Sequence, residues 1–365
     1  MTSVDAAVES GATTRARARL IDVDVHPVLA TNIGAMLEYV PRGWRERLEY
    51  LGSTPLSSSP LNYTFLAGRW VVGVNARPAT EAPPGSTAES LQGELLDAHG
   101  VDVGQLVASE AAAHAQSRSY DLAAILASAF NDLMLERWMD DPRTRYALLV
   151  TPADPVAAAA EVRRHGADRR VSSVWIPTTP TRLGDRRLYP IYEAALEHGL
   201  PILSHPGGPA GSMSTPALAL ESRFNGPTQV WPNVTSLVAR GVFERYPELR
   251  VLFAESGFTW LPPLLRRMDA AWRASGGKVA HLERSPSEVV RTHLRFATTP
   301  LDDDRDAAEL AALIEDPSTC LADVLVFSSN HPRSGPEWPG LRFEALPDAT
   351  RRRLFAENAL TCMRI

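Results

Sequence analysis

Two aspartates and a histidine alternate with aliphatic residues near the start of the sequence, in the run LIDVDVHP at residues 20–27. Successive side chains of a β-strand point to opposite faces, so Asp22, Asp24 and His26 share one face. If that face looks outward, the three groups are simply hydrated. If it is buried, they need partners, because unpaired buried charge is costly. A metal ion is one such partner, and Asp24 and His26 are therefore candidate ligands.

Further metal-binding side chains stand where later apolar runs end. His205 ends the run at 200–205, and Glu255 ends the run at 249–255. Carboxylates and imidazoles that converge from different strands suit Zn²⁺ or Fe²⁺. We predict one divalent ion held by Asp24, His26, His205 and Glu255. Zinc is our first expectation, and iron and manganese are the alternatives, because the same ligand types suit all three.

The other histidines are better explained by structural roles, apart from His331, which also follows an apolar run. Three of them precede a glycine at the end of a helical pattern, where a histidine interacts favourably with the helix dipole. One begins an apolar run, at the end of a strand opposite to the candidate ligands. The remaining two lie in a polar connection and after the second apolar run. The three histidines before glycines are His99, His165 and His198. His293 begins the apolar run, His281 lies in the polar connection, and His114 follows the second apolar run.

Eight short apolar runs, rich in valine, leucine and isoleucine, alternate with helical patterns along the chain. Nearly continuous apolar runs are typical of parallel strands that are buried on both faces. Asp154 and Pro155 form a helix N-cap and first turn, and Gly166 and Gly199 stand where the glycines that follow helices belong. The fold class is therefore α/β, a (β/α)8 TIM barrel. Its strands are predicted within residues 18–26, 101–109, 144–152, 171–178, 200–205, 249–255, 293–299 and 323–329.

The predicted organisation is a flexible tail over 1–17 and a single metal-binding barrel domain over 18–365. Residues 27–90 hold no clear helix or strand pattern and follow strand 1, so they form an insertion on the active-site face. Residues 206–230 form a second insertion, after strand 5. Aromatic side chains in the first insertion resemble interface anchors, which predicts that the working protein is not a monomer. A lid packed on its own barrel explains them equally well; they are Trp44, Tyr50, Tyr63, Phe65 and Trp70.

Composition excludes several classes of function. The formal net charge of −6 favours neither nucleic acid nor an anionic membrane as a partner, and no apolar run approaches the roughly 20 residues of a membrane span. The N-terminal segment has no apolar core of a secretory signal, and two cysteines exclude a disulfide scaffold or thiolate cluster. We therefore expect a cytoplasmic protein. Lys278 is the single lysine, which nearly excludes Schiff-base chemistry.

Longer motifs make the chain resemble the amidohydrolase-related family, in the branch of aminocarboxymuconate-semialdehyde decarboxylase and the resorcylate decarboxylases. They are the first-strand DVH, LPILSHPGG, RYPELRVLFAESGFTWLPPLLRRMD, FSSNHPRSGPEWPG and the terminal ENAL. The resemblance implies a barrel with one or two divalent metals at its mouth, and ligands that map onto Asp24, His26, His205 and Glu255. Relatives that bridge two metals use a carbamylated lysine on strand 4. The corresponding VSSVWIPTT has no lysine, which excludes that architecture.

Strand 8 departs from the family pattern. Relatives read serine, aspartate, an aromatic residue, proline and histidine, whereas this chain reads SNHPR at 329–333. Asn330 replaces the acidic ligand with an amide that binds metal weakly and cannot act as a base near neutral pH. Arg333 is a permanent cation that would repel a second metal. His331 is a substitute candidate for the catalytic group, although the strand alternation points it away from the face of Asn330.

Three functions are compatible with this reduced site. The chain is a subunit that works with a homologous catalytic chain, as in two-subunit non-haem di-metal amine N-hydroxylases (monooxygenases) of this fold. Alternatively, it is a stand-alone mononuclear hydrolase or decarboxylase of a small amide, ester or carboxylate, or a metal-stabilised binding protein without chemistry. A homo-oligomer is the alternative assembly. The candidates for lining the mouth of the barrel are Trp175, Arg333 and Trp338. Packing or contact with a partner would explain these residues equally well.

Overall fold

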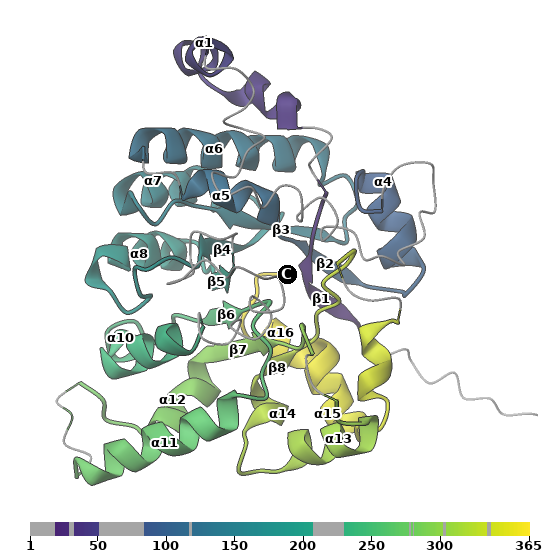
Figure 1. The fold of residues 1–365 in the computed structure, drawn as a ribbon, viewed down its shortest axis with the longest axis vertical. Helices are drawn as coiled ribbons and strands as arrows, with labels where there is room; N and C mark the ends of the chain where they lie inside the picture. Colours follow the sequence, from purple (N-terminus) through teal and green to yellow (C-terminus); the bar gives the residue numbers. More distant parts are fainter. Residues whose placement is uncertain are drawn as a thin grey trace, which may run out of the picture.

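Eight parallel strands form one sheet in the order β1 to β8 (Figure 1). The computed structural model describes residues 19–28, 33–50, 84–116, 119–206, 230–276, 279, 281–301, 304–333 and 337–365. Each of the eight strands lies within one of the ranges predicted from the sequence. The strands are β1 Ile21–Val25, β2 Val103–Leu106, β3 Thr144–Leu149, β4 Val171–Pro177, β5 Ile202–His205, β6 Val251–Phe253, β7 Leu294–Ala297 and β8 Leu325–Val326.

The sheet closes on itself between β8 and β1. The backbone amide of Val23 donates to the carbonyl of Phe327 at 3.1 Å, and the amide of His26 donates to the carbonyl of His331 at 2.8 Å. A parallel bridge also joins Val25 to His331. These contacts bring the two ends of the sheet together in a nearly closed barrel and confirm the predicted (β/α)8 fold.

Helices separate the strands and cover the outside of the barrel (Figure 1). The predicted cap is present, since the Asp154 carboxylate accepts from the amides of Val156 and Ala157. Ser285 and Asp306 also begin capping boxes, which were not singled out from the sequence. The α-helices are α1 Arg42–Tyr50, α4 Ala88–Leu91, α5 Ala112–Ala115, α6 Tyr120–Arg137, α7 Pro155–His165, α8 Tyr189–Glu197, α10 Val242–Arg245, α11 Leu261–Ala274, α12 Pro286–His293, α13 Ala307–Glu315, α14 Leu321–Val324, α15 Asp348–Arg352 and α16 Asn358–Leu360. Shorter 3₁₀ or π segments are η1 Ile33–Tyr39, η2 Gln92–Asp97, η3 Ser109–Ala111, η4 Arg186–Leu188, η6 Pro339–Phe343 and η7 Arg353–Glu357.

Two expectations from the sequence were wrong. Residues 27–90 were predicted to hold no regular element, but η1, α1 and α4 begin there. Gly166 was placed among the glycines that follow helices, which commonly adopt a left-handed backbone, as Gly199 does with φ +64°. Gly166 has φ −61° instead, and a Cβ there would lie 2.3 Å from a ring atom of His198. Close packing of α7 against α8, not backbone geometry, therefore explains this glycine.

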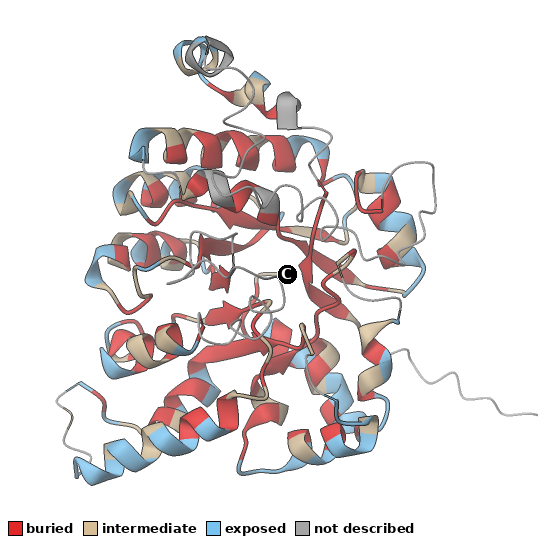
Figure 2. Cartoon of the chain, in the orientation of Figure 1, coloured by how far each residue is buried: buried red, intermediate tan, exposed pale blue. Residues whose placement is uncertain are grey.

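Strand residues are buried on both faces, while helices expose only their outer sides (Figure 2). In β1, the aliphatic Ile21, Val23 and Val25 and the polar Asp22 and Asp24 all have 0% exposure. A wet outer face is thus excluded for the alternating polar residues. They lie inside the barrel, where their charges need partners.

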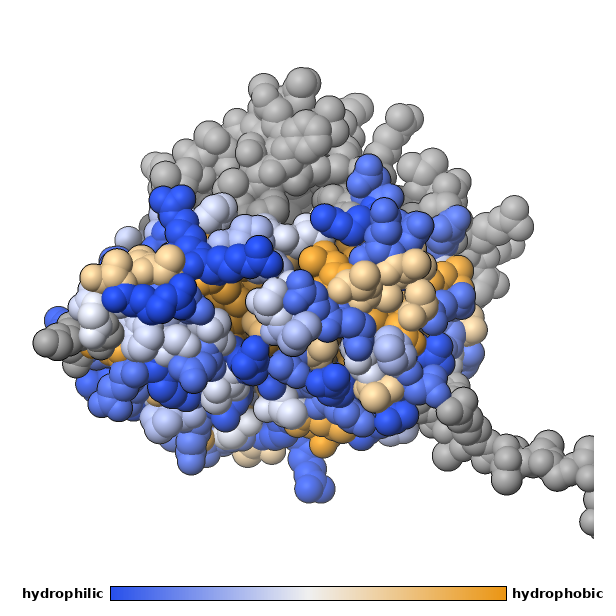
Figure 3. All heavy atoms as spheres, turned by 90° about the horizontal axis from the view of Figure 1, so that it is seen from below, coloured by the Kyte–Doolittle hydropathy of each residue, from blue (hydrophilic) through white to orange (hydrophobic). Residues whose placement is uncertain are grey.

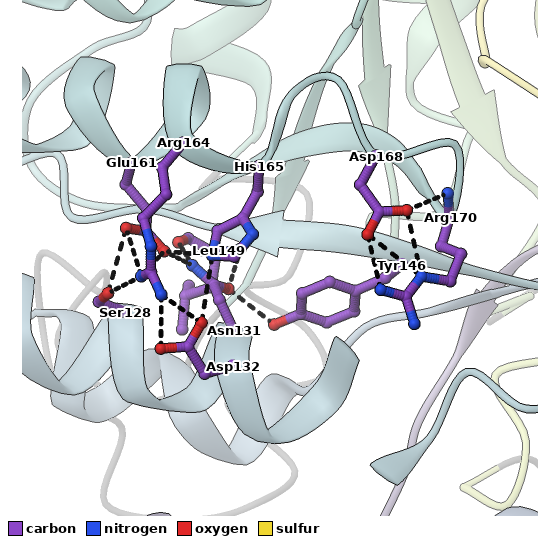
Figure 4. A network of polar contacts seen from close by, with 10 residues as sticks. All are labelled: Ser128, Asn131, Asp132, Tyr146, Leu149, Glu161, Arg164, His165, Asp168 and Arg170. Atoms are coloured by element: carbon purple, nitrogen blue, oxygen red, sulfur yellow. Dashed lines mark hydrogen bonds and ion pairs between the residues drawn. The ribbon is translucent and has the colours of Figure 1, made fainter. Parts of the chain in front are cut away.

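A buried asparagine joins α6 and α7 to β3 (Figure 4). The Asn131 amide nitrogen donates to the carbonyl of Leu149 and to Glu161, both at 2.9 Å. Its oxygen accepts from the Tyr146 hydroxyl and from the Leu149 amide. His165 ends α7 beside Asp132 and Glu161. These contacts satisfy all four hydrogen-bonding positions of the Asn131 amide. The network therefore orients the helices, and His165 has the structural role predicted for it.

The C-terminal residues close the end of the barrel opposite to the candidate ligands, and the C-terminus lies near the barrel axis in Figure 1. The Arg364 guanidinium donates to the carbonyls of Gly166 at 2.6 Å, Val171 at 2.7 Å, His198 at 3.3 Å and Asp168. These carbonyls precede or begin strands β4 and β5. One charged side chain therefore satisfies four backbone acceptors, which come from the α7–β4 connection, the start of β4 and the α8–β5 connection.

Replacing Arg364 with alanine should lower the free energy of unfolding by roughly 2–4 kcal/mol, because hydrogen bonds from a charged donor are lost and backbone acceptors are left unpaired. Urea denaturation of the metal-free protein measures this. Arg352→Ala is the matched control, since its side chain is 55% exposed and lies 3.9 Å from Glu357. Equal midpoints for the two variants would show that the Arg364 contacts contribute nothing.

His293 ends α12 as a neutral, buried imidazole. Its Nδ1 donates to the Leu249 carbonyl at 3.1 Å, and its Nε2 accepts from Arg284 at 3.1 Å. Its ring stacks on Phe243 at 4.5 Å between centroids. Burial, and then the neighbouring arginine charges, lower the pKa of His293 to about 4. As predicted, this histidine lies away from the candidate ligands.

Because the pKa of His293 is lower in the folded chain than in the unfolded one, its stabilising contribution is complete above about pH 6.5 and is lost as the pH falls toward 4. The loss should be at most about 3 kcal/mol. Unfolding free energies of wild type and His293→Gln measured from pH 7 to pH 4 isolate it, because other titrating groups are common to both proteins. Parallel curves would contradict the assignment.

The face shown in Figure 3, at the lower edge of Figure 1, is mainly hydrophilic with separate smaller hydrophobic areas. None of the helices that the structure describes is long and apolar enough to cross a membrane. Large hydrophobic side chains that are exposed lie scattered over the fold, among them Tyr120, Val156, Trp231, Leu341 and Leu360.

Candidate metal centre

Three side chains from opposite sides of the barrel meet at the carboxyl ends of the strands. Nε2 of His26, just after β1, lies 3.4 Å from Oδ1 of Asp24. Nε2 of His205, the last residue of β5, lies 3.4 Å from the same oxygen. One ligand atom from each of the three residues lies within 4.8 Å of the others. All three residues have 0% exposure.

Backbone carbonyls fix the orientation of both imidazoles. Nδ1 of His26 lies 3.1 Å from the carbonyl oxygen of Val107, and Nδ1 of His205 lies 2.5 Å from that of Pro206. A carbonyl can only accept, so each Nδ1 carries the proton and donates it. Each Nε2 therefore presents a lone pair toward Asp24. Metal-binding histidines are held in this way by a contact of their second ring nitrogen.

The converging atoms make ion-pair contacts with one another but lack hydrogen-bond partners among the described residues. Both carboxylate oxygens of Asp24 and the Nε2 atoms of His26 and His205 are buried without a hydrogen bond. Four acceptors that face one another need a shared cation, because buried acceptors without donors are costly. Two imidazoles and a carboxylate are ligands that zinc, iron and manganese accept. The residues present therefore fit a divalent ion.

The electrostatics favour the protonation states of metal ligands at Asp24 and His26, whereas at His205 they favour the protonated imidazole. Burial opposes ionisation of Asp24, but the imidazoles of His26 and His205 outweigh it and hold the pKa of the Asp24 carboxyl well below its usual range. Burial, and then the Arg333 charge, lower the pKa of His26. Burial also opposes protonation of His205, but Asp24 and Glu255 together raise its pKa. An anionic Asp24 beside a neutral His26 is the form that binds metal.

Glu255 adjoins this group without being part of its tightest cluster. Its Oε2 lies 3.2 Å from Nε2 of His205 and 3.8 Å from Nη1 of Arg333, and its side chain is 27% exposed. Its backbone is left-handed, with φ +48°. The structure thus brings the four predicted ligands together, with Glu255 on the solvent side. That they bind a metal remains a prediction.

The strand-8 segment places an amide beside the group. The amide N–H of Asn330 donates to the Asp24 carbonyl at 3.1 Å, and its backbone is left-handed with φ +57°. Its side-chain oxygen is buried without a hydrogen bond. His331 turns elsewhere: its Nε2 lies 3.4 Å from Oε2 of Glu94. His331 is therefore paired with an acid outside the predicted ligand set, as the alternation of the strand predicted.

Sequence reasoning missed several residues around the site. Ser109 accepts a hydrogen bond from Arg333, and Glu94 pairs with His331. Asp22 accepts from the backbone amides of Ser329 and Asp24, which fixes strand 8 to strand 1. Burial raises the pKa of Asp22 to about 7. The position of Asp22 inside the barrel was visible in the alternation of the first strand, whereas Ser109 and Glu94 carry no sequence signal.

The tryptophans proposed for the mouth are packing residues. Trp175 is fully buried in β4, and its ring lies edge-on to His205 at 5.7 Å between centroids. Trp338 stacks on His99 at 4.0 Å between centroids and also contacts Phe327. Of the three proposed lining residues, Arg333 lies beside the predicted ligands. Outside the described residues lie Tyr63, Phe65, Trp70 and residues 207–229 of the second insertion, which was predicted at 206–230.

The solved structures similar in fold include several decarboxylases of aromatic acids. The 5-carboxyvanillate decarboxylase of Sphingomonas paucimobilis is 21% identical with a TM-score of 0.69, covering 96% of this chain and 100% of that chain. The same enzyme from Novosphingobium aromaticivorans, with manganese and a nitrobenzoic acid ligand, is 18% identical with a TM-score of 0.67 (93% and 95% covered). A dihydroxybenzoic acid decarboxylase of Polaromonas, with manganese and 2-nitroresorcinol, is 16% identical with a TM-score of 0.62 (95% and 97% covered). At these identities the likeness shows the fold.

Sequence comparison identifies the family. None of the curated proteins matches the chain. The amidohydrolase family model matches residues 21–364, which spans every strand of the barrel and all four predicted ligands. The chain belongs to the amidohydrolase family.

Proposed function

We propose that the chain holds one divalent metal through Asp24, His26 and His205, with Glu255 as the fourth ligand, and that it works as the reduced-site subunit of a metal-dependent enzyme. One observation supports the metal site: buried acceptor atoms of Asp24, His26 and His205 face one another without hydrogen-bond donors. When bound, such an ion supplies a Lewis acid at the mouth of the barrel. Zinc remains our first expectation, and the manganese named for two structural neighbours supports manganese as the alternative.

The reduced-site proposal rests on the strand-8 segment. Asn330 can neither take nor give a proton near neutral pH. His331 offers a titratable group, but it faces Glu94. A homologous chain with an aspartate at the position of Asn330 would supply the missing acid–base group. Metal-dependent amine N-hydroxylation by such a pair is the reaction that we propose for the complex.

A second candidate is a stand-alone mononuclear decarboxylase, or a hydrolase of a small amide or ester. It is favoured by the neighbours, whose names describe decarboxylation of aromatic acids. Decarboxylation breaks the bond from the ring carbon to the carboxylate and requires a proton at that carbon. With an amide at position 330 and His331 facing Glu94, the strand-8 segment presents no proton donor toward the predicted ligands, which is why we place this function second.

Native mass and turnover of the purified chain, alone and co-expressed with a homologue that has the strand-8 aspartate, test the proposal. We expect the metal-loaded chain alone to turn over neither simple amides and esters nor aromatic carboxylates. We also expect a hetero-oligomer with oxygen-dependent conversion of an amine. A stable monomer that decarboxylates 2,6-dihydroxybenzoate by itself would replace the first candidate with the second.

A further inference from the structure

Arg333 reaches across the mouth of the barrel beside the predicted ligands. Its backbone amide donates to the Asn330 carbonyl at 2.7 Å, which turns the chain after strand 8. Its Nη2 donates to the Ser109 hydroxyl oxygen at 2.5 Å, and its Nη1 lies 3.8 Å from Oε2 of Glu255. The guanidinium is thus held between the ends of β2 and β6.

Stability alone does not explain this placement. The Arg333 side chain is only 18% exposed, and its Nε is buried without a hydrogen-bond partner among the described residues. A buried donor that lacks an acceptor is unfavourable. The Ser109 hydroxyl, itself buried, fixes the guanidinium and leaves its Nε without an acceptor among the described residues.

The charges at the mouth indicate what would bind there. With a divalent ion bound, that ion and Arg333 would carry three positive charges against the two negative charges of Asp24 and Glu255, so one positive charge would remain among these four groups; Glu94, which pairs with His331, lies outside this count. An anion would balance it. Parallel N–H groups of a guanidinium match the two oxygens of a carboxylate, and such charge-assisted pairs are among the stronger hydrogen bonds.

We propose that Arg333, oriented by Ser109, anchors a carboxylate of the small molecule that binds at the metal centre. This rests on the proposed metal centre and holds for either candidate reaction. It assigns the ligand to the small carboxylic acids, with the carboxylate at the Nε edge of Arg333 and the rest of the molecule directed toward the predicted ligands. If Arg333 served only to neutralise Glu255, its removal would change metal affinity without distinguishing charged from uncharged ligands.

Calorimetric titration of the manganese-loaded chain separates these roles. The probes are 2,6-dihydroxybenzoate, resorcinol, which lacks the carboxylate, and inorganic phosphate, which is a tetrahedral anion. We expect Arg333→Gln to weaken dihydroxybenzoate binding about 10- to 100-fold and to leave resorcinol binding unchanged. Ser109→Ala should weaken dihydroxybenzoate binding several-fold, because the Arg333 guanidinium loses its fixed orientation. Arg187→Gln is the control, since Arg187 pairs with Asp185 on the surface, with a side chain 71% exposed.

Equal dihydroxybenzoate affinity for wild type and Arg333→Gln would overturn the anchor, as would a metal-loaded wild type that binds none of the carboxylate at millimolar concentration. Phosphate bound more tightly than the carboxylate would overturn the assignment of ligand class. Metal analysis of the same samples keeps the two proposals apart. If wild type takes up no metal, the metal centre fails, and the anchor is then decided by whether carboxylate binding to the metal-free chain depends on Arg333.

Discussion

Replacing His205 with alanine should strip the chain of its metal. Nε2 of His205 is one of the three ligand atoms that lie within 4.8 Å of one another, and it also joins Asp24 to Glu255. We expect the metal content to fall from about one ion per chain to nearly none, because the site would lose a ligand and its link to the fourth. An ion present at 100 times its dissociation constant stabilises the folded chain by about 2.7 kcal/mol, and this stabilisation should disappear.

Elemental analysis and thermal unfolding with and without a chelator measure both effects. His281→Ala is the matched control, because His281 is an exposed histidine whose Nε2 contacts the Ala239 carbonyl. The control should keep its metal and its response to the chelator. Metal content unchanged in His205→Ala would remove His205 from the site.

Changing Asn330 to aspartate should tighten metal binding by about tenfold or more, because a charged oxygen would replace a neutral amide beside Asp24. The Asn330 side-chain oxygen is already buried without a partner. Asparagine and aspartate both tolerate the left-handed backbone found there, so the variant should fold. Competition with a chromogenic chelator measures the affinity.

The Asn330→Ala variant separates the effect of the left-handed backbone at position 330 from any chemical role of the side-chain amide. Alanine is disfavoured at φ +57°, so this variant should lose roughly 1–2 kcal/mol of stability while its metal affinity changes little. Turnover assays on both variants extend the test, since Asn330→Asp restores a group that can move a proton. Metal-dependent turnover by wild type that Asn330→Ala abolishes would show that the amide itself is catalytic and would contradict the reduced-site proposal.

The barrel could be predicted from the sequence because its signals are local. Each strand is a short apolar run, and caps such as Asp154 mark helix starts within one turn. The predicted ligands were also visible locally, since polar residues at the ends of buried strands converge once the barrel is assumed. The alternation of β1 left open whether Asp22 and Asp24 face solvent, and only the closed barrel resolves that.

Contacts between distant segments were beyond prediction. Arg364 satisfies carbonyls nearly 200 residues away, and Arg333 meets Ser109 across 224 positions. Neither partner has a distinctive pattern, because serine hydroxyls and backbone carbonyls occur throughout the chain. The helices of the first insertion were missed because they are short, and α1 is poor in apolar residues. Such helices are specified by tertiary contacts more than by their own periodicity.

The central claim is that Asp24, His26, His205 and Glu255 hold one divalent ion. Its most direct test is to remove all metal from the purified chain with a chelator and titrate it by calorimetry with Zn²⁺, Mn²⁺ and Fe²⁺ under anaerobic conditions, beside Asp24→Asn. We predict a stoichiometry of about one ion per wild-type chain and affinity at least 100-fold weaker in the variant. Wild-type chain that binds none of the three ions, or that binds them as tightly when Asp24 is replaced, would contradict the claim.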